Sequence, residues 1–402
     1  MTQQPLAIIR PRIEAEVSAF IQELHAQDIP FGTRSGGHDM TAAQARGRDG
    51  VMIDLRAMGS ISIAEDKKSA RIGGGTLSIK LSNFLQQHKL LTPHGWCPTV
   101  GTVDTDDHPD LLWALRGVGN SNFGILVEHR IKLYPKTGFL AGFLGFPAAE
   151  AGDVLIKFGK FEKELPINFI GEATHMTLPG VGPVLAWLSA WTSEDDDVDN
   201  GWRFLERMKA LARHTDTQKV SVVDDYTFLN TIPSPTNTHW HPRLGTFEYL
   251  APELANVFVS HPPPGAACAT VMHTAHGRAL NKKPGACHPP RTRRRIAAIS
   301  VGIVDATAQA AEYEKYKNWA DDMVDDLCKQ RHALLYGCRN LSSDTDVDWV
   351  ATYGEETAAR LKEVKKKFDP ANVFKNGYPR LDLLRGEIWA AAAAPITVFS
   401  IP

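Results

Sequence analysis

The chain has 402 residues, of which 43% are hydrophobic and 22% are charged, and its formal net charge is -2. This length is enough for two or three domains with hydrophobic cores. The near-neutral charge gives no sign of a nucleic-acid-binding protein. The five cysteines are widely scattered and form no CxxC pair, which argues against a disulfide-stapled scaffold and against a zinc site of the CxxC type.

Neither end of the chain carries a targeting or membrane signal. The N-terminus becomes polar within a few residues, so no secretory leader is predicted for the chain as given. The stretch 388–402 is apolar, but it is too short to span a bilayer and is interrupted by Pro395. We expect neither a membrane nor a nucleic acid among the partners. The compartment is left unknown, and the chain as given favours the cytoplasm.

The first third of the chain alternates between helix and strand patterns. Apolar residues at helical spacing predict an amphipathic helix over residues 13–24, and Pro30 follows it. Strands are predicted within 50–58 and 61–75, and a second helix over 77–91. Such alternation is typical of an α/β layer arrangement.

Beyond residue 138 the pattern changes. Apolar runs of strand length at 139–147, 183–191 and 297–306 are interleaved with helical segments such as 200–213. These runs predict a second domain built on an antiparallel sheet. The basic, Pro-containing interval 281–295 is predicted to be a solvated loop.

Residues 33–40 read TRSGGHDM and place two glycines directly before a histidine. Glycine allows backbone conformations that are closed to other residues, so this turn can bring consecutive N–H groups close to an anion such as a phosphate. His38 then sits at the tip of the turn, where its ring can meet the bound group. A Gly-Gly-His turn alone is more often a surface loop, so the prediction depends on the motifs that accompany it.

A second motif, LTPHGWCPTVG at 91–101, places Cys97 in a turn rich in glycine and proline. Such a cysteine can be a buried thiol, a redox cysteine or a site of covalent attachment, and the first is the commonest. Between the two motifs, RIGGGT at 71–76 lacks the GxGxxG spacing and the acidic partner of a nicotinamide-binding Rossmann domain. We interpret Gly73 to Gly75 as a tight turn with little direct chemistry.

In this order, the RSGGH, GGGT and HGWCPTVG motifs resemble those of the berberine-bridge-enzyme-like family of flavin oxidases, which carry a PCMH-type FAD-binding domain. The resemblance continues through 108–135, which is similar to the family's segment around the adenosine half of FAD. Residues 353–381 are similar to the family's C-terminal element, which returns to the flavin domain.

The resemblance implies an α+β fold. A two-part PCMH-type FAD-binding domain is expected beside a substrate domain whose antiparallel sheet is covered by helices. The expected divisions are a shortened FAD-binding domain at 1–135, a substrate-binding domain at 136–335, a C-terminal element at 336–385 and a tail at 386–402.

The resemblance also implies FAD as the cofactor, attached to the protein at two points. In the family a histidine of the first motif is linked to the 8α carbon of the flavin and a cysteine of the second to C6, and the match assigns these roles to His38 and Cys97. Two links hold the ring rigidly and are expected to raise its reduction potential. The residues expected to bind the cofactor are Arg34, Ser35, Gly36, Gly37, His38, Asp39, Cys97, Val100, Gly101, Gly124, Ile125 and Asn372.

Two segments that are usual in the family have no counterpart in the chain as given. One is a leader with a first strand and helix before Met1, and the other is a glycine-rich stretch after Gly101, where GTVDTDDHPDLLWALRG follows at once. We therefore expect a shortened FAD-binding domain.

The catalytic base is expected near a segment that reads LLYGCRNLSSD. The family often carries a Y-x-N motif, in which the tyrosine deprotonates the substrate hydroxyl. Aligned on Asn340, that position is Cys338 here, and Tyr336 lies two residues earlier, on the same face if the segment is a strand. Tyr336 and Cys338 are therefore the catalytic candidates, each with an alternative role in packing.

Several histidines raise the alternative of a metal site. His273 lies where the family's substrate sheet faces the flavin, with His276 close by in sequence and His239 and His241 in a separate pair. No acidic or thiol partner stands at ligand spacing, so we expect dispersed structural or pocket histidines and no metal.

The leading hypothesis is an FAD-dependent oxidase or dehydrogenase that acts on a small molecule such as an alcohol, a sugar or a secondary-metabolite intermediate. The substrate would lose a hydride to flavin N5, and O2 would reoxidise the flavin. Two alternatives stay open, namely an inactive or flavin-free member of the family and a non-redox cyclase that uses the same pocket.

Overall fold

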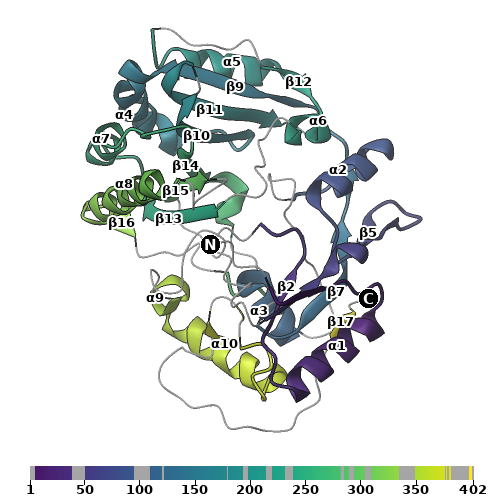
Figure 1. Cartoon of the computed structure of the whole chain (residues 1–402). Coiled ribbons are helices and arrows are strands. Elements are labelled where there is room, and N and C mark those ends of the chain that lie inside the picture. The colour runs from purple at the N-terminus through teal and green to yellow at the C-terminus, as the bar shows by residue number, and fades with distance from the viewer. Residues whose placement is uncertain are drawn as a thin grey trace.

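The computed structural model shows an α+β architecture, which confirms the predicted fold class. In Figure 1 a large sheet with its helices occupies the upper part of the molecule, and smaller sheets lie at the lower right. The described residues are 5–38, 50–94, 109–119, 122–178, 180–192, 198–213, 220–230, 239–281, 285–288, 294–303, 309–334, 349–375, 377, 380–381 and 398–400.

A three-stranded parallel sheet in the order β1-β3-β2 opens the N-terminal half. Helix α1 packs through Val17, Ile21 and Leu24, which recur at helical spacing and are buried, so the helix predicted from the sequence is present. The register pairs Arg34 at the end of β2 with Asp54 at the end of β3. The elements of this layer are β1 (Ala7–Ile9), α1 (Glu14–Ala26), β2 (Phe31–Arg34), β3 (Val51–Asp54) and the 3-10 helix η2 (Leu55–Ala57).

A four-stranded sheet in the order β17-β7-β5-β4 forms the second part of this half, and β6 pairs with β8 beside it. Strand β7 runs antiparallel to β5 and parallel to β17. The elements are β4 (Ile61–Ile63), β5 (Ser69–Gly73), α2 (Ser78–Gln87), β6 (Leu90–Leu91), α3 (Pro109–Val118), β7 (Ile125–Lys132), β8 (Tyr134–Pro135) and β17 (Val398–Ser400).

An eight-stranded antiparallel sheet in the order β12-β9-β11-β10-β14-β15-β13-β16 is the framework of the second half. Side chains alternate across it: on β10, Phe169 and Ala173 enter the main hydrophobic core, whereas Ile170 and Glu172 lie on the opposite face. The strands are β9 (Phe139–Pro147), β10 (Phe169–Leu178), β11 (Gly182–Thr192), β12 (Ser221–Val223), β13 (His239–Phe247), β14 (Cys268–Ala275), β15 (Arg294–Ile303) and β16 (Ala333–Leu334).

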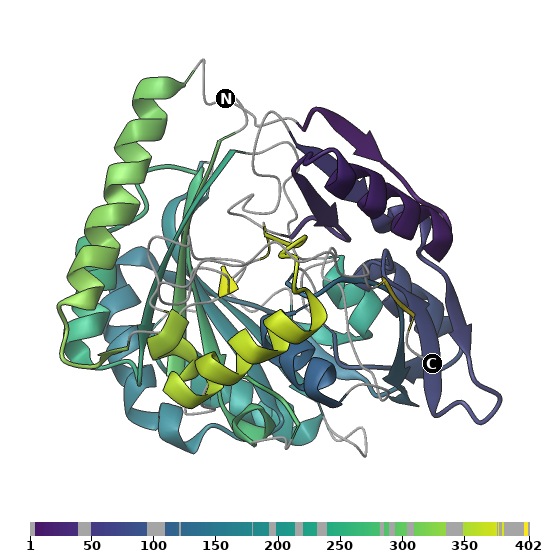
Figure 2. The ribbon, with the colours of Figure 1, turned by 90° about the horizontal axis from the view of Figure 1, so that it is seen from below.

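Helices α4, α5, α7 and α8 cover the core face of this sheet. The other face, which we call the inner face, turns toward the N-terminal half in Figure 2, and Phe228 of α6 packs on part of it. Within the described chain, no helix has both the length and the apolar character needed to cross a bilayer. The bounds are η3 (Ala148–Glu150), α4 (Ala151–Phe161), η4 (Glu162–Glu164), α5 (Asp199–Lys209), α6 (Asp225–Leu229), α7 (Pro252–Ser260), η5 (Gly277–Leu280) and α8 (Ala310–Cys328).

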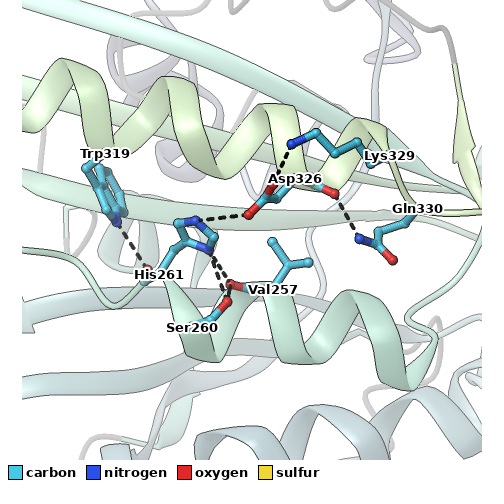
Figure 3. A network of polar contacts seen from close by, with 7 residues as sticks. All are labelled: Val257, Ser260, His261, Trp319, Asp326, Lys329 and Gln330. Atoms are coloured by element: carbon cyan, nitrogen blue, oxygen red, sulfur yellow. Dashed lines mark hydrogen bonds and ion pairs between the residues drawn. The ribbon is translucent and has the colours of Figure 1, made fainter.

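His261, at the C-terminal end of α7, fastens α7 to α8 on the core face (Figure 3). Its Nδ1 donates to the carbonyl oxygen of Val257 at 3.0 Å, and its Nε2 lies 3.5 Å from a carboxylate oxygen of Asp326. The indole N–H of Trp319 donates to the His261 carbonyl at 3.2 Å. This histidine is therefore part of the framework that holds the helices on the sheet.

The C-terminal element returns to the N-terminal half through α9 (Trp349–Tyr353) and α10 (Glu355–Phe368). Its anchor is Lys365, whose side chain is only 1% exposed. The ammonium donates to Asp369 at 2.5 Å, to the Asn122 carbonyl at 2.7 Å and to the Phe374 carbonyl at 3.2 Å. Asp369 in turn accepts the backbone N–H groups of Val373 and Phe374. This buried ion pair therefore joins α10 to the segment before β7.

The prediction of a solvated loop over 281–295 is wrong in two places. Cys287 is 2% exposed, and it packs against α3 with its N–H on the Trp113 carbonyl at 2.9 Å and its thiol on the Ala114 carbonyl at 3.1 Å. Residues 294 and 295 belong to β15. Tertiary contacts with α3 and with the sheet override the polar composition of this interval.

We expect Lys365→Met to lower the free energy of unfolding by about 3–5 kcal/mol, because it leaves a buried carboxylate without its cation. The measurement is urea unfolding followed by circular dichroism. Lys366→Met is the matched control, since Lys366 is exposed and its ion pair with Glu363 is long at 3.8 Å. Equal unfolding midpoints for the two variants would contradict the anchoring role.

Candidate functional site

The loop after β2 carries the predicted Arg34–His38 motif, and its geometry is that of a tight, glycine-dependent turn. The hydroxyl of Ser35 donates to the Gly74 carbonyl at 2.6 Å and ties the loop to the end of β5. Gly37 has a φ of +74°, and a Cβ atom there would lie 2.8 Å from Nε of Arg34. Any other residue at this position would be strained and would collide with the arginine.

The Gly73–Gly75 segment is a site of close backbone packing, in agreement with its interpretation as a tight turn. Cβ atoms on the three glycines would lie 1.9 Å from the Met58 carbonyl oxygen, 2.0 Å from that of Leu126 and 1.8 Å from that of Leu55. These glycines therefore let the backbone of this segment lie close to the chain at Leu55, Met58 and Leu126.

Three arginines surround a single buried carboxylate beside this loop. Asp54, with a side chain 1% exposed, accepts hydrogen bonds from Nε of Arg56 at 2.8 Å and from Arg10 at 3.1 Å. Burial alone would raise the pKa of Asp54, but the hydrogen bonds from Arg56 and Arg10 outweigh it and lower the pKa to about 2. The carboxylate is thus held in its charged form, and the cluster keeps a surplus of positive charge.

Arg34 supplies this surplus positive charge at the loop itself. Its Nε is buried and has no hydrogen-bond partner among the described residues. Burial, followed by repulsion from Arg56, lowers the pKa of Arg34 from its ordinary value. A buried N–H donor without an acceptor is costly, so this position suits an anionic ligand. The donor set therefore fits the diphosphate of a nucleotide cofactor.

Three other predicted cofactor residues, Gly124, Ile125 and Asn372, belong to segments outside this loop. Gly124 and Ile125 stand where β7 begins, one strand away from Gly74, whose N–H donates to the Val127 carbonyl at 2.7 Å. The Ile125 side chain is fully buried in the core of the parallel layer, so only its backbone could meet a ligand. Asn372 adopts a φ of +49° in the segment after α10.

The segment that carries Asn372 reaches the beginning of β2 rather than its end. Phe374 packs edge-on against Phe31 with ring centroids 5.8 Å apart. Six of the predicted site residues lie outside the described part of the chain, namely Asp39, Cys97, Val100, Gly101, Tyr336 and Cys338.

The histidines fall into separate environments. His241 pairs with Asp321 of α8 at 3.0 Å on the core face, whereas His273 lies on the inner face. Within the described residues, no group of three or more His, Cys, Asp or Glu side chains is arranged to hold a metal ion.

His273 has a partner that the sequence analysis missed. Its Nδ1 lies 2.6 Å from a carboxylate oxygen of Glu172 on the neighbouring strand β10. The available signal was a single acidic residue at an alternating position of an otherwise apolar strand pattern. Its pairing with a residue 101 positions away depends on sheet topology.

Two family comparisons match the two ends of this architecture. Residues 5–103 match the sequence model of the FAD binding domain, and residues 315–378 match that of the berberine and berberine-like element. The chain belongs to the berberine-bridge-enzyme-like family of FAD-linked oxidoreductases. The first match contains the Arg34 loop and the Gly73–Gly75 segment, and the second contains the Lys365 anchor.

The relatives and solved structures span nearly the whole chain. FAD-linked oxidoreductase aurO of Gibberella zeae is 28% identical, covering 95% of this chain and 81% of its own length. (R)-6-hydroxynicotine oxidase of Paenarthrobacter nicotinovorans is 26% identical, covering 94% and 91%. The structure of 6-hydroxy-D-nicotine oxidase from Arthrobacter nicotinovorans aligns with a TM-score of 0.76 at 20% identity, over 94% of this chain and 93% of that one.

Berberine bridge enzyme from Eschscholzia californica aligns with a TM-score of 0.75 at 17% identity, over 91% of this chain and 88% of that one. These alignments confirm the predicted PCMH-type architecture.

We expect Asp54→Asn to destabilise the protein in a pH-dependent way. The folded-state pKa of about 2 lies below the ordinary 3.8, so the carboxylate stabilises the fold above about pH 4 and loses this contribution as the pH falls toward 2. The deficit of the variant should be about 2 kcal/mol at pH 6 and should shrink below pH 4. Denaturant unfolding at several pH values measures it, with exposed Asp66→Asn as the control. A deficit that does not change with pH would contradict the assignment.

Proposed function

We propose that the chain is an FAD-dependent oxidase that takes a hydride from an alcohol, a sugar or a secondary-metabolite substrate, with O2 as the electron acceptor. The observation that carries the proposal is the buried Nε of Arg34 beside the Gly37 turn, which has no hydrogen-bond partner among the described residues and lies inside the segment that matches the FAD binding domain. When bound, the flavin would supply the capacity to accept a hydride and to react with O2. The protein supplies binding and orientation.

In this proposal the N-terminal loop holds the diphosphate. Arg34 donates from Nε, and the backbone of Ser35, Gly36, Gly37, His38 and Asp39 offers N–H groups, as turns of this type do for anions. Arg10 and Arg56 hold Asp54 in its charged form, and the two arginines leave this cluster with a net positive charge. Val100, Gly101, Gly124, Ile125 and Asn372 are proposed as further cofactor contacts.

His38 and Cys97 are proposed to attach the flavin covalently at the 8α and C6 positions. His38 is half-buried at the end of the described loop, and the described chain resumes as far as His94, three residues before Cys97. The segment approaching Cys97 is held beside β7, because the Thr92 hydroxyl donates to the Lys132 carbonyl at 2.8 Å. Both attachment residues thus follow strands of the N-terminal half.

The inner face of the large sheet is proposed as the substrate side. It turns toward the N-terminal half (Figure 2), and Gln86 of α2 donates to Asp224, before α6, at 2.5 Å across the two halves. Relatives named as oxidases of 6-hydroxynicotine and of chitooligosaccharides support a small-molecule substrate. Tyr336 and Cys338 are proposed to line the substrate pocket, with Tyr336 as a candidate for proton transfer.

The purified protein should carry flavin that survives acid precipitation and fluoresces in a denaturing gel. His38→Ala and Cys97→Ala should each leave one attachment, and the double variant should release all flavin on precipitation. A yellow protein whose flavin is lost in either single variant alone would contradict the double attachment. A colourless protein that takes up no added FAD would contradict the proposed function.

Arg34→Met should weaken FAD binding about 10- to 100-fold, since a hydrogen bond to a charged group contributes about 1.5–3 kcal/mol. The measurement uses the His38→Ala, Cys97→Ala background, in which FAD binds without covalent attachment, and follows the quenching of FAD fluorescence. Inorganic pyrophosphate should compete in the parent and lose this ability in the Arg34 variant. Exposed Arg12→Met is the matched control, and an equal effect of the two changes would contradict the role of Arg34.

A further inference from the structure

Glu172 and His273 form an isolated polar pair on the inner face. Strands β10 and β14 are antiparallel neighbours, and the pairing of Ala173 with Met272 places the two polar residues side by side one position further on. Met272 and Ala173 enter the core, so Glu172 and His273 lie on the opposite face. Their distance of 2.6 Å is that of a strong, charge-assisted hydrogen bond.

The strand register gives the neighbours of the pair. The register places Leu188 of β11 beside Glu172 and Ile296 of β15 beside His273. Among the described residues, the Glu172 carboxylate is the charged group paired with His273. Within the described residues, neither Glu172 nor His273 has a further ion pair.

The geometry assigns different roles to the two imidazole nitrogens. A carboxylate only accepts hydrogen bonds, so Nδ1 of His273 carries a proton and donates it in the hydrogen bond to Glu172. In the neutral ring, Nε2 therefore keeps its lone pair. Within the described residues Nε2 has no hydrogen-bond partner, and the His273 side chain is 37% exposed. Burial lowers the pKa of His273, but the charge and the hydrogen bond of Glu172 raise it more, so that the net pKa lies above the ordinary value.

We propose that the Glu172–His273 pair is a proton acceptor for a hydroxyl-bearing small molecule bound on the inner face. The O–H bond of the ligand breaks, its oxygen keeps the electron pair, and Nε2 of His273 gains the proton. Glu172 keeps Nδ1–H in place and stabilises the resulting imidazolium. The inference rests on the proposed function, in which a bound flavin would supply the acceptor for the hydride lost from the carbon that bears this oxygen.

This assignment explains why a charged side chain occupies an apolar stretch of sheet. A carboxylate that orients an imidazole leaves the distal nitrogen ready for proton transfer. His241 and Asp321 make a comparable pair at 3.0 Å, but on the core face beside α8, so they provide a matched control inside the same sheet.

The first test follows the titration of His273 by NMR in the full-length, flavin-loaded protein with labelled histidines. Chemical reduction of the flavin adds negative charge, which should raise the pKa of His273. Glu172→Gln should lower the pKa of His273 in both redox states. A flavin-loaded protein whose His273 titration is the same in both states would overturn the proton-acceptor role alone. A protein that holds no flavin would overturn the proposed function instead.

The second test measures anaerobic flavin reduction against pH, with (R)-6-hydroxynicotine and a chitooligosaccharide as the probes. The rate should rise with pH as the imidazolium loses its proton, and Glu172→Gln should move this rise to lower pH. His273→Gln should lower the rate at least about 100-fold and remove the pH dependence, while His241→Gln leaves both unchanged. Retained flavin absorbance checks that each variant is folded.

The outcome that would overturn the proposal is a pH dependence that persists in His273→Gln and disappears in Tyr336→Phe. The titration experiment decides the proposal whichever probe reduces the flavin, because it needs no turnover.

Discussion

The buried ion pair of Lys365 and Asp369 is the constraint that closes this fold. An ammonium removed from water needs an acceptor for each of its three N–H bonds, and here the acceptors are Asp369 and the carbonyls of Asn122 and Phe374. Because Asn122 immediately precedes the strand region of β7, the pair is complete only when the C-terminal element returns to the N-terminal half. Phe374 is thereby brought into contact with Phe31, which fixes the beginning of β2, at the opposite end from its loop.

With β2 held in this way, the two halves provide complementary environments. The end of β2 gathers cationic groups around one carboxylate and leaves the Nε of Arg34 without an acceptor in the described chain, which favours an anion there. In the described part of the large sheet, the inner face carries an apolar cluster around Phe228 and the imidazole–carboxylate pair of His273 and Glu172. The proposed anion-binding and proton-transfer sites therefore lie on different layers of the fold.

The sequence predicted the elements whose signals are local. The helix near Val17 and Ile21 and the strand-length runs beginning at Phe139 are present, because 3.6- and 2-residue periodicities report burial along a single element. The glycine turn around Gly37 was also predictable, since its backbone conformation excludes other residues. The solvated-loop prediction failed at Cys287, whose burial depends on a contact with Ala114, 173 positions away.

By itself, the sequence determined the α+β class, the order of the two halves and the contiguous Arg34–His38 loop, because each depends on neighbouring residues and on the motifs that resemble a flavin-oxidase family. Only the tertiary structure decided which charges meet. Asp54 is enclosed by Arg10 and Arg56, and Glu172 meets His273 across 101 positions, through strand pairing. Sheet order and register set such contacts, and both result from the packing of the whole chain rather than from any local pattern.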